Sequence, residues 1–201
     1  MKIDITEKIK DVLSGRKPEK IDNRAEQLIH AAVLIPIFET GNGYEVLFTE
    51  RTHKVEHHKG QISFPGGAVE NRDKNYKETA LRETYEEVGL MTEDVEVLGQ
   101  LDDELTIASS FVVHPFVGKI PCPYDFKINR DEVERIITVP LDLFFEENSD
   151  RHPDSIEFEN FTYRGPAYRY DDVTIWGATA TIMKHFIRIL DGNKSLPEKI
   201  E

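Results

Sequence analysis

The chain has 201 residues, a length that fits one domain with a substantial hydrophobic core. Lys and Arg number 25 against 38 Asp and Glu, and the net charge of −13 argues against a general nucleic-acid surface or an anionic membrane as partner, though not against a small phosphorylated ligand. A lone cysteine, Cys122, cannot form an internal disulfide, and the sequence shows neither a signal-peptide apolar region nor a run near the ~20 residues of a membrane span, so we expect a cytoplasmic protein.

The first 30 residues predict a helical segment that packs on the rest of the chain, which forms the main domain over residues 31–201. Apolar residues at positions 5, 9, 12 and 13 have the spacing of a short amphipathic helix, and Gly15 ends it. A second helical turn is expected over residues 23–30. This segment carries no residues that indicate chemistry, so we interpret it as a docking or dimerising element.

The continuous apolar run over residues 31–38 is typical of a strand covered on both faces. Gly41-Asn42-Gly43 then predicts a hairpin into a second strand over residues 44–51, which ends at Arg51. The following connection, residues 52–60, is rich in nitrogen donors, which are His53, Lys54, His57, His58 and Lys59. Their spacing fits no zinc site, so this connection is either a solvated loop or a source of positive charge for phosphate oxygens.

Residues 60–90 organise the chain, because they predict a strand, a glycine turn and a helix. The positions that recur every four residues, and so predict a narrow buried stripe on the helix, are Tyr76, Ala80, Thr84 and Val88. Asp73 or Asn75 can cap the start of the helix. Gly89 suits its end, because a left-handed backbone costs little without a Cβ.

This helix carries three glutamates spaced i, i+3 and i+4, which are Glu83, Glu86 and Glu87. They share one face at a Cβ spacing of about 5–6 Å, where like charges repel unless a cation lies among them. Hard oxygen ligands suit Mg²⁺ or Mn²⁺ rather than zinc. Gly66 and Gly67 let the backbone approach the same ion, because no side chain intervenes. The plain alternative is a solvated acidic helix face, but the glycines and Arg82 favour a metal and phosphate site.

The same residues resemble the Nudix hydrolase box, which runs glycine, five residues, glutamate, seven residues, then Arg-Glu-apolar-any-Glu-Glu-any-Gly-apolar. Gly67 opens this pattern, and residues 82–90 close it. Two positions depart from it. Asp73 stands where the first glutamate belongs, with eight residues rather than seven before Arg82, and Thr84 replaces an apolar residue.

The segment upstream resembles the coenzyme A pyrophosphatase subgroup of that family. The subgroup pattern is Leu-Leu-Thr-any-Arg-Ser/Ala, three residues, Arg, three residues, Gly, three residues and Phe-Pro-Gly-Gly. Here residues 47–52 read Leu-Phe-Thr-Glu-Arg-Thr, Gly60 lies at the expected spacing, and residues 64–67 read Phe-Pro-Gly-Gly. Glu56 stands where the subgroup has its second arginine, which leaves another nucleotide open as the substrate.

The resemblance covers residues 31–190 and implies an α/β (α+β) fold, an α/β/α sandwich around a mixed β-sheet. The later elements that we expect are strands over 95–101 and 111–118, a strand and short helix over 132–141, a hairpin of 156–163 with 168–170, and a final helix over 175–190.

Several polar residues after the box have two interpretations. The run Asp102-Asp103-Glu104 could add a carboxylate near the metals, but a common acidic loop is the favoured interpretation. His114 lies among apolar residues and is interpreted as a core histidine with its hydrogen bonds satisfied. We expect Glu132 or Glu134 to face the substrate cleft, and the alternative is a charge on an edge strand.

The resemblance implies hydrolysis that depends on Mg²⁺ or Mn²⁺, here of coenzyme A or a derivative to 3′,5′-ADP and 4′-phosphopantetheine. Metal ligands would be Glu83, Glu86, Glu87 and the Gly67 carbonyl, and the catalytic residues would be Glu83 as base, Arg82 and Glu86. Substrate-binding residues would be Arg51, Lys54, His58, Lys59 and Gly66. The alternatives are another nucleotide (an NDP-sugar, ADP-ribose, a dinucleotide or a dNTP) and a non-catalytic nucleotide-binding module. A homodimer is also open.

Overall fold

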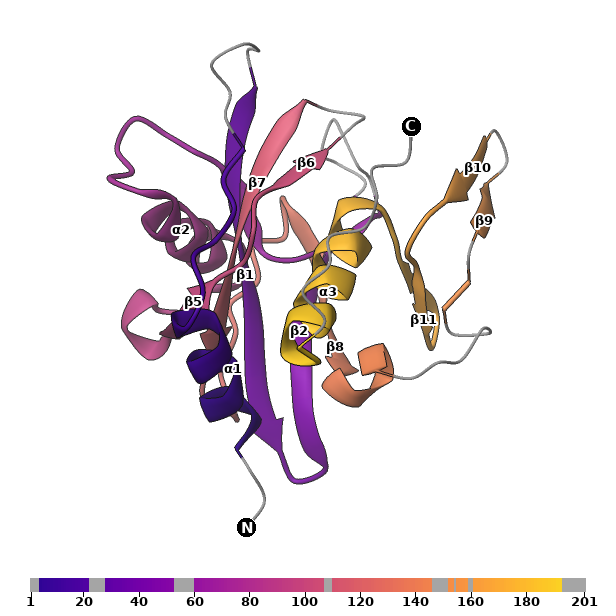
Figure 1. The fold of residues 1–201 in the computed structure, drawn as a ribbon. Helices are drawn as coiled ribbons and strands as arrows, with labels where there is room; N and C mark the ends of the chain where they lie inside the picture. The colour runs from indigo at the N-terminus through magenta and orange to yellow at the C-terminus, as the bar shows by residue number, and fades with distance from the viewer. Residues whose placement is uncertain are drawn as a thin grey trace.

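The structure is a computed structural model, and the residues that it describes are 4–21, 28–52, 60–106, 110–145, 152–153, 155–158 and 161–192. A central sheet lies between helices on its two faces (Figure 1). The α-helices of the described chain are α1 (Ile5–Ser14), α2 (Tyr76–Val88) and α3 (Gly177–Leu190). The described chain also has two short 3-10 helices, η1 (Thr92–Asp94) between α2 and the next strand, and η2 (Leu141–Phe145) between two strands.

The main sheet is mixed. Its strands are β1 (Ile29–Thr40), β2 (Gly43–Arg51), β3 (Ile62–Ser63), β4 (Gly66–Ala68), β5 (Glu96–Gln100), β6 (Glu104–Thr106), β7 (Phe111–Lys119) and β8 (Val133–Pro140). The path β3-β2-β1-β7-β5 runs through it, with β8 paired to β2, β4 to β1 and β6 to β7. β1 and β7 are parallel, and the other pairs are antiparallel. Separate hairpins are β9 (Ser155–Phe158) with β10 (Phe161–Arg164), and β11 (Tyr168–Tyr170) with β12 (Val173–Ile175).

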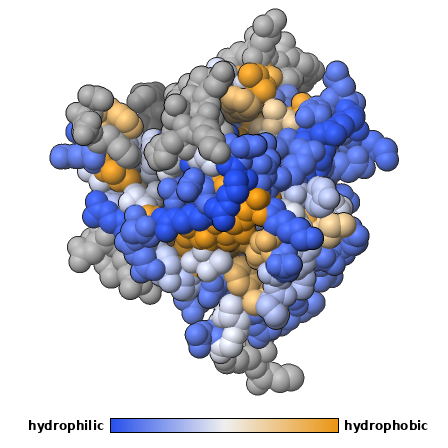
Figure 2. All heavy atoms as spheres, turned by 180° about the vertical axis from the view of Figure 1, so that it is seen from behind, coloured by the Kyte–Doolittle hydropathy of each residue, from blue (hydrophilic) through white to orange (hydrophobic). Residues whose placement is uncertain are grey.

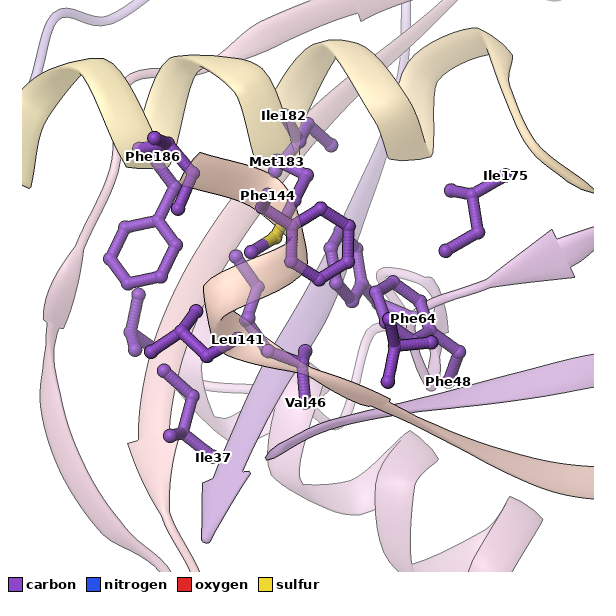
Figure 3. Packing of buried hydrophobic residues seen from close by; sticks show 14 of the residues in the cluster. Ile37, Val46, Phe48, Phe64, Leu141, Phe144, Ile175, Ile182, Met183 and Phe186 are labelled. Atoms are coloured by element: carbon purple, nitrogen blue, oxygen red, sulfur yellow. The ribbon is translucent and has the colours of Figure 1, made fainter. Parts of the chain in front are cut away.

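The apolar run of β1 divides two hydrophobic layers because its side chains alternate between the two faces of the sheet. Ala32 and Leu34 pack in the layer that contains α2, whereas Ile35 and Ile37 pack in the layer that contains α1 and α3. Figure 3 shows residues of the second layer, where Phe186 and Met183 of α3 lie over the sheet. Burial of a side chain such as Phe186 contributes roughly 1.5–3 kcal/mol to stability.

Most predicted elements are confirmed, and the differences involve pairing between segments. The hairpin at Gly41-Asn42-Gly43 forms, and Gly15 follows the first helix. Residues 29–30 belong to β1 rather than to a helical turn, because they pair with β7, and the rest of that predicted turn (residues 23–28) lies almost wholly outside the described residues. The segment 168–170 pairs with Val173–Ile175 and not with 156–163, so the final helix begins at Gly177 rather than at residue 175.

The N-terminal segment is fastened to the domain by Asp102 and Asp103. Arg16 is hydrogen-bonded to Asp102, which also accepts from the backbone N–H of Glu19 at 2.7 Å. Asp103 accepts from the backbone N–H of Ile21 at 3.1 Å. Helix α1 itself packs on β5 and α3.

The surface is mainly hydrophilic on the side turned away from the viewer in Figure 1, with hydrophobic residues gathered near its centre (Figure 2). Among the described helices, none has both the length and the apolar content that crossing a bilayer requires.

Candidate active site on helix α2

Helix α2 is capped at both of its ends. Oδ1 of Asn75 accepts the N–H of Glu78 at 3.0 Å, and Gly89 follows with φ 70°, a left-handed conformation. Of the two predicted caps, Asn75 is the one observed. Beyond the helix, backbone N–H groups of Lys127 and Asn129 donate to its last carbonyls, both at 2.9 Å. These contacts fix the face that the glutamates share.

Three of the four predicted stripe positions of α2 are buried, and the fourth, Tyr76, is partly buried against the same cluster. The stripe includes Thr84, one of the two departures from the family pattern. Ala80, Thr84 and Val88 are fully buried against the sheet. Oγ1 of Thr84 donates to the carbonyl of Ala80 at 2.7 Å, so its hydroxyl is satisfied within the helix. Thr84 therefore occupies an apolar position without leaving an unpaired polar group.

The two glycines ahead of the helix form strand β4, paired with β1, and not the predicted turn. A Cβ on Gly66 would lie 2.3 Å from the carbonyl oxygen of Ala32 in β1. A Cβ on Gly67 would lie 2.4 Å from Oε2 of Glu83. Because neither glycine carries a side chain, the backbone of β4 fits between the central strand and the glutamates of α2.

Arg82 is anchored by the residue that stands in place of the first glutamate of the box. Its Nε and Nη2 donate to Oδ1 and Oδ2 of Asp73, each at 2.9 Å. This contact holds the pKa of Asp73 well below its ordinary value. Nη1 of Arg82 donates to Oε1 of Glu83 at 2.7 Å and to Oε2 of Glu86 at 3.0 Å. Asp73 is shorter than the glutamate of the family pattern and lies one residue further from Arg82, yet it still forms a bidentate ion pair with Arg82.

Glu87 is the least satisfied of the three glutamates. Its side chain is almost fully buried, and its Oε2 has no hydrogen-bond partner among the described residues. Burial raises the pKa of Glu87 to about 8, against the opposing charge of Arg51. Nη1 of Arg51 lies 3.9 Å from Oε1 of Glu87, and Nε of Arg51 is also buried without a partner in the described part of the chain. Such groups are costly to bury unless something else binds them.

Glu83 lies in a similar environment, and one further carboxylate faces it. Burial raises the pKa of Glu83, which the hydrogen bond from Arg82 opposes. The charge of Glu132 raises the pKa of both Glu83 and Glu87. Of the two residues that were expected to face the cleft, Glu132 is therefore the one beside the glutamates, whereas Glu134 is exposed.

The structure separates the remaining candidates from this face. Asp102 and Asp103 bind the N-terminal segment, and Asp103 accepts from His114 at 2.7 Å. His114 also lies 2.8 Å from Nδ1 of His30, so it is a core histidine with both ring nitrogens in contact. The predicted substrate-binding residues Lys54, His58 and Lys59 lie outside the described residues.

The donor set of this face fits a divalent cation. No three carboxylate or imidazole groups of the described residues converge at metal-binding distance, and Glu83 and Glu86 are paired with Arg82. The buried, unpartnered Oε2 of Glu87 and the carboxylate of Glu83, which fills the space beside the Cα of Gly67, nevertheless give a position lined by oxygen donors. Oxygen donors of this kind suit Mg²⁺ or Mn²⁺.

Comparison with known proteins supports the family that the sequence resembles. The NUDIX domain model matches residues 28–158. The uncharacterized Nudix hydrolase NudL of Pectobacterium atrosepticum is 39% identical over 153 residues, which cover 76% of this chain and 78% of the relative. The NudL protein of Photorhabdus laumondii is 38% identical over 154 residues, or 77% of this chain and 81% of the relative.

Solved structures support the fold. A MutT/nudix family protein from Enterococcus faecalis matches with a TM-score of 0.57 and 17% identity, over 94% of this chain and 70% of that chain. A MutT protein from Methanosarcina mazei Go1 matches with a TM-score of 0.52 and 19% identity, over 85% of this chain and 100% of that chain. With the family model and the NudL relatives, the described fold and the arrangement on α2 show that the chain belongs to the Nudix hydrolase family.

Proposed function

We propose that the chain hydrolyses the diphosphate of coenzyme A or a derivative, in a reaction that depends on Mg²⁺ or Mn²⁺. Nudix hydrolases generally use divalent metal ions and act on small nucleotides. The observation that carries the metal assignment is the buried carboxylate of Glu87, whose Oε2 lacks a partner among the described residues. The choice of coenzyme A is supported by the spacing of residues 47–67, which matches the coenzyme A pyrophosphatase pattern at all but a few positions.

The metal ligands in this proposal are the carboxylates of Glu83, Glu86 and Glu87 with the carbonyl of Gly67. When bound there, a divalent ion neutralises the diphosphate and lowers the pKa of a coordinated water. Arg82 holds Glu83 and Glu86 through Nη1. Its own orientation is set by Asp73, so Arg82 acts on the reaction by positioning carboxylates.

Glu83 is the proposed general base, and Arg51 is proposed to contact a phosphate. The oxygen of water forms a bond to one phosphorus while the bridging P–O bond breaks. One proton of the water passes to Glu83, and the departing phosphate keeps the bonding electron pair. The products are 3′,5′-ADP and 4′-phosphopantetheine. The buried Nε of Arg51 provides a donor for a phosphate oxygen, and we propose the same role for Lys54, His58 and Lys59, and for the backbone of Gly66.

We also propose that residues 1–30 and 31–201 form one domain in a cytoplasmic protein. The contacts of Asp102 and Asp103 with the N-terminal segment support the first part. The single cysteine, Cys122, supports the second, because the chain needs no oxidising compartment for an internal disulfide.

A second candidate function is hydrolysis of another nucleotide, which Glu56 favours. Its carboxylate stands where the subgroup has an arginine, and a negative charge would weaken binding of a polyanion such as coenzyme A. If this position limits the coenzyme A reaction, Glu56→Arg raises coenzyme A turnover.

The test is a substrate panel of coenzyme A, NADH, ADP-ribose and dNTPs, each with Mg²⁺ and with Mn²⁺. Release of 3′,5′-ADP from coenzyme A is the expected result, and turnover of ADP-ribose with none of coenzyme A would reject that substrate. Glu86→Gln should lower the rate by orders of magnitude without unfolding the protein. Glu78→Gln is the matched control, because Glu78 lies in the first turn of the same helix and contacts Lys74 instead.

A further inference from the structure

Arg72 contacts one of the proposed metal ligands from outside the conserved pattern of the box. It lies in the connection between β4 and α2, and its Nη2 donates to Oε1 of Glu86 at 2.9 Å. Its Nε lies 2.7 Å from Oε2 of Glu70. Because Arg82 donates to the other oxygen of Glu86 at 3.0 Å, both oxygens of this carboxylate face a guanidinium.

The two arginines are held very differently. Arg82 is 14% exposed and makes a bidentate pair with Asp73, whose side chain is 3% exposed. Arg72 is 59% exposed, and its second partner, Glu70, is 51% exposed. Exposed ion pairs contribute little because water and salt screen them, so the Arg72 contact to Glu86 is the one that another cation can displace.

A second observation, which does not involve Arg72, also indicates that a cation binds beside these glutamates. Oε2 of Glu87 is buried without a partner among the described residues, in the residue that follows Glu86 on α2. The guanidinium of Arg72 pairs with Glu86 and Glu70, so it does not supply the missing partner of Oε2 of Glu87. Since Arg82 holds Oε2 of Glu86, the departure of Arg72 would free Oε1 of this carboxylate for a divalent ion.

We propose that Arg72 neutralises Glu86 in the metal-free protein, yields this carboxylate to the divalent ion, and then binds the diphosphate while Glu70 holds it beside the site. This inference rests on the metal site of the proposed function and adds a positioning and phosphate-binding residue to it. It implies opposite effects on two ligands. Arg72 competes with the metal ion, since both are cations, and it favours the nucleotide, since a phosphate is an anion.

The test measures both ligands on the intact chain. Free Mn²⁺ is followed by electron paramagnetic resonance during a titration without nucleotide. ADP, as a diphosphate probe, is titrated into Mn²⁺-saturated protein by calorimetry. Arg72→Ala should bind Mn²⁺ on the order of three- to tenfold more tightly, because it removes an ion pair and a nearby positive charge. It should bind ADP about three- to tenfold more weakly for the converse reason.

Two variants make the comparison specific. Lys74→Ala removes an exposed basic residue of the same connection that lies near Glu78 at 3.9 Å, and it should change neither affinity appreciably. Arg72→Lys keeps the charge and should return both affinities toward those of the wild type.

The results separate this inference from the proposed function. An unchanged or weaker Mn²⁺ affinity in Arg72→Ala, or an unchanged ADP affinity, overturns the inference even if coenzyme A is hydrolysed normally. Opposite shifts of the two affinities support it even if coenzyme A proves not to be the substrate. Absence of Mn²⁺ binding by the wild type overturns both the inference and the metal assignment.

Discussion

Two groups of carboxylates lie partly or fully inside this molecule, and their partners differ. On α2, Glu87 is buried with an unpartnered oxygen in the described structure, and burial raises its pKa to about 8. After β5, burial also acts on Asp102 and Asp103, but hydrogen bonds outweigh it and lower the pKa of each. Asp102 is bound by Arg16, by the N–H of Glu19 and by His185. A group that the chain itself satisfies stabilises the fold, whereas a group left unsatisfied is available to a ligand.

The largest effect that tests this comparison is loss of activity in Glu87→Gln. The variant removes a ligand charge at constant shape, so the hydrolysis rate should fall by on the order of 10²–10³-fold or more. The metal-free protein should be no less stable than the wild type at neutral pH, because burial keeps Glu87 protonated there and the amide is likewise neutral. Steady-state rates and thermal unfolding without metal measure the two effects. A lower melting temperature with normal activity would place Glu87 with the structural carboxylates.

Gly67→Ala tests whether the space beside Glu83 matters. The added Cβ would lie 2.4 Å from Oε2 of Glu83, so this carboxylate must move, and we expect a rate about 10–100-fold lower with a folded protein. Gly41→Ala is the matched control, since a Cβ there meets no atom within 4 Å. Equal rates for the two variants would contradict a requirement for close approach at Gly67.

Asp103→Asn should have the opposite profile to Glu87→Gln. Asp103 accepts hydrogen bonds from His114 and from the N–H of Ile21, and its side chain is 1% exposed. Loss of its charge should lower the free energy of unfolding by about 2–4 kcal/mol, and the rate per folded molecule should change little. Denaturant unfolding measures the first effect. Asp172→Asn, which breaks an exposed pair with Arg135, should change the free energy of unfolding far less, because water and salt screen this pair.

The sequence predicted the elements whose signals are local and missed the contacts that join distant segments. The caps of α2, the hairpin at residues 41–43 and the buried stripe each depend on neighbours within a few positions. The partners of Asp102 do not, since Arg16 lies 86 positions away in the chain. For the same reason, Gly66–Ala68 appeared as a turn, because its pairing with β1 is set by tertiary packing.

The sequence indicated which residue types form the candidate site, but not how these residues are arranged in space. The i, i+3, i+4 glutamates indicated a shared face, which the helix provides. Nothing in the spacing distinguished Glu87, which is buried, from Glu86, whose side chain is 39% exposed. The contact of Arg72 with Glu86 also had no signal, because the box pattern specifies no residue type at position 72.

Glu104 follows Asp103 directly in the chain, yet its pKa is shifted in the same direction as that of Glu87. Burial raises the pKa of Glu104 to about 7, above the ordinary value near 4.3 of an unfolded chain. A carboxyl with a raised pKa in the folded protein contributes its stability fully below the unfolded pKa, and this contribution is lost as the pH rises through the folded pKa. Asp103 has a lowered pKa, so its contribution is present above about pH 4 and is lost in acid.

The last prediction is therefore a difference in pH dependence between Glu104→Gln and the wild type. Between pH 5 and pH 8, the free energy of unfolding of the wild type should fall by about 1–3 kcal/mol more than that of Glu104→Gln, because glutamine does not ionise. Denaturant unfolding of both proteins across this range, with chelator present, measures the difference. Parallel curves would mean that hydrogen bonds offset the burial of Glu104 as they do for Asp103. The carboxylates that follow β5 would then all behave alike.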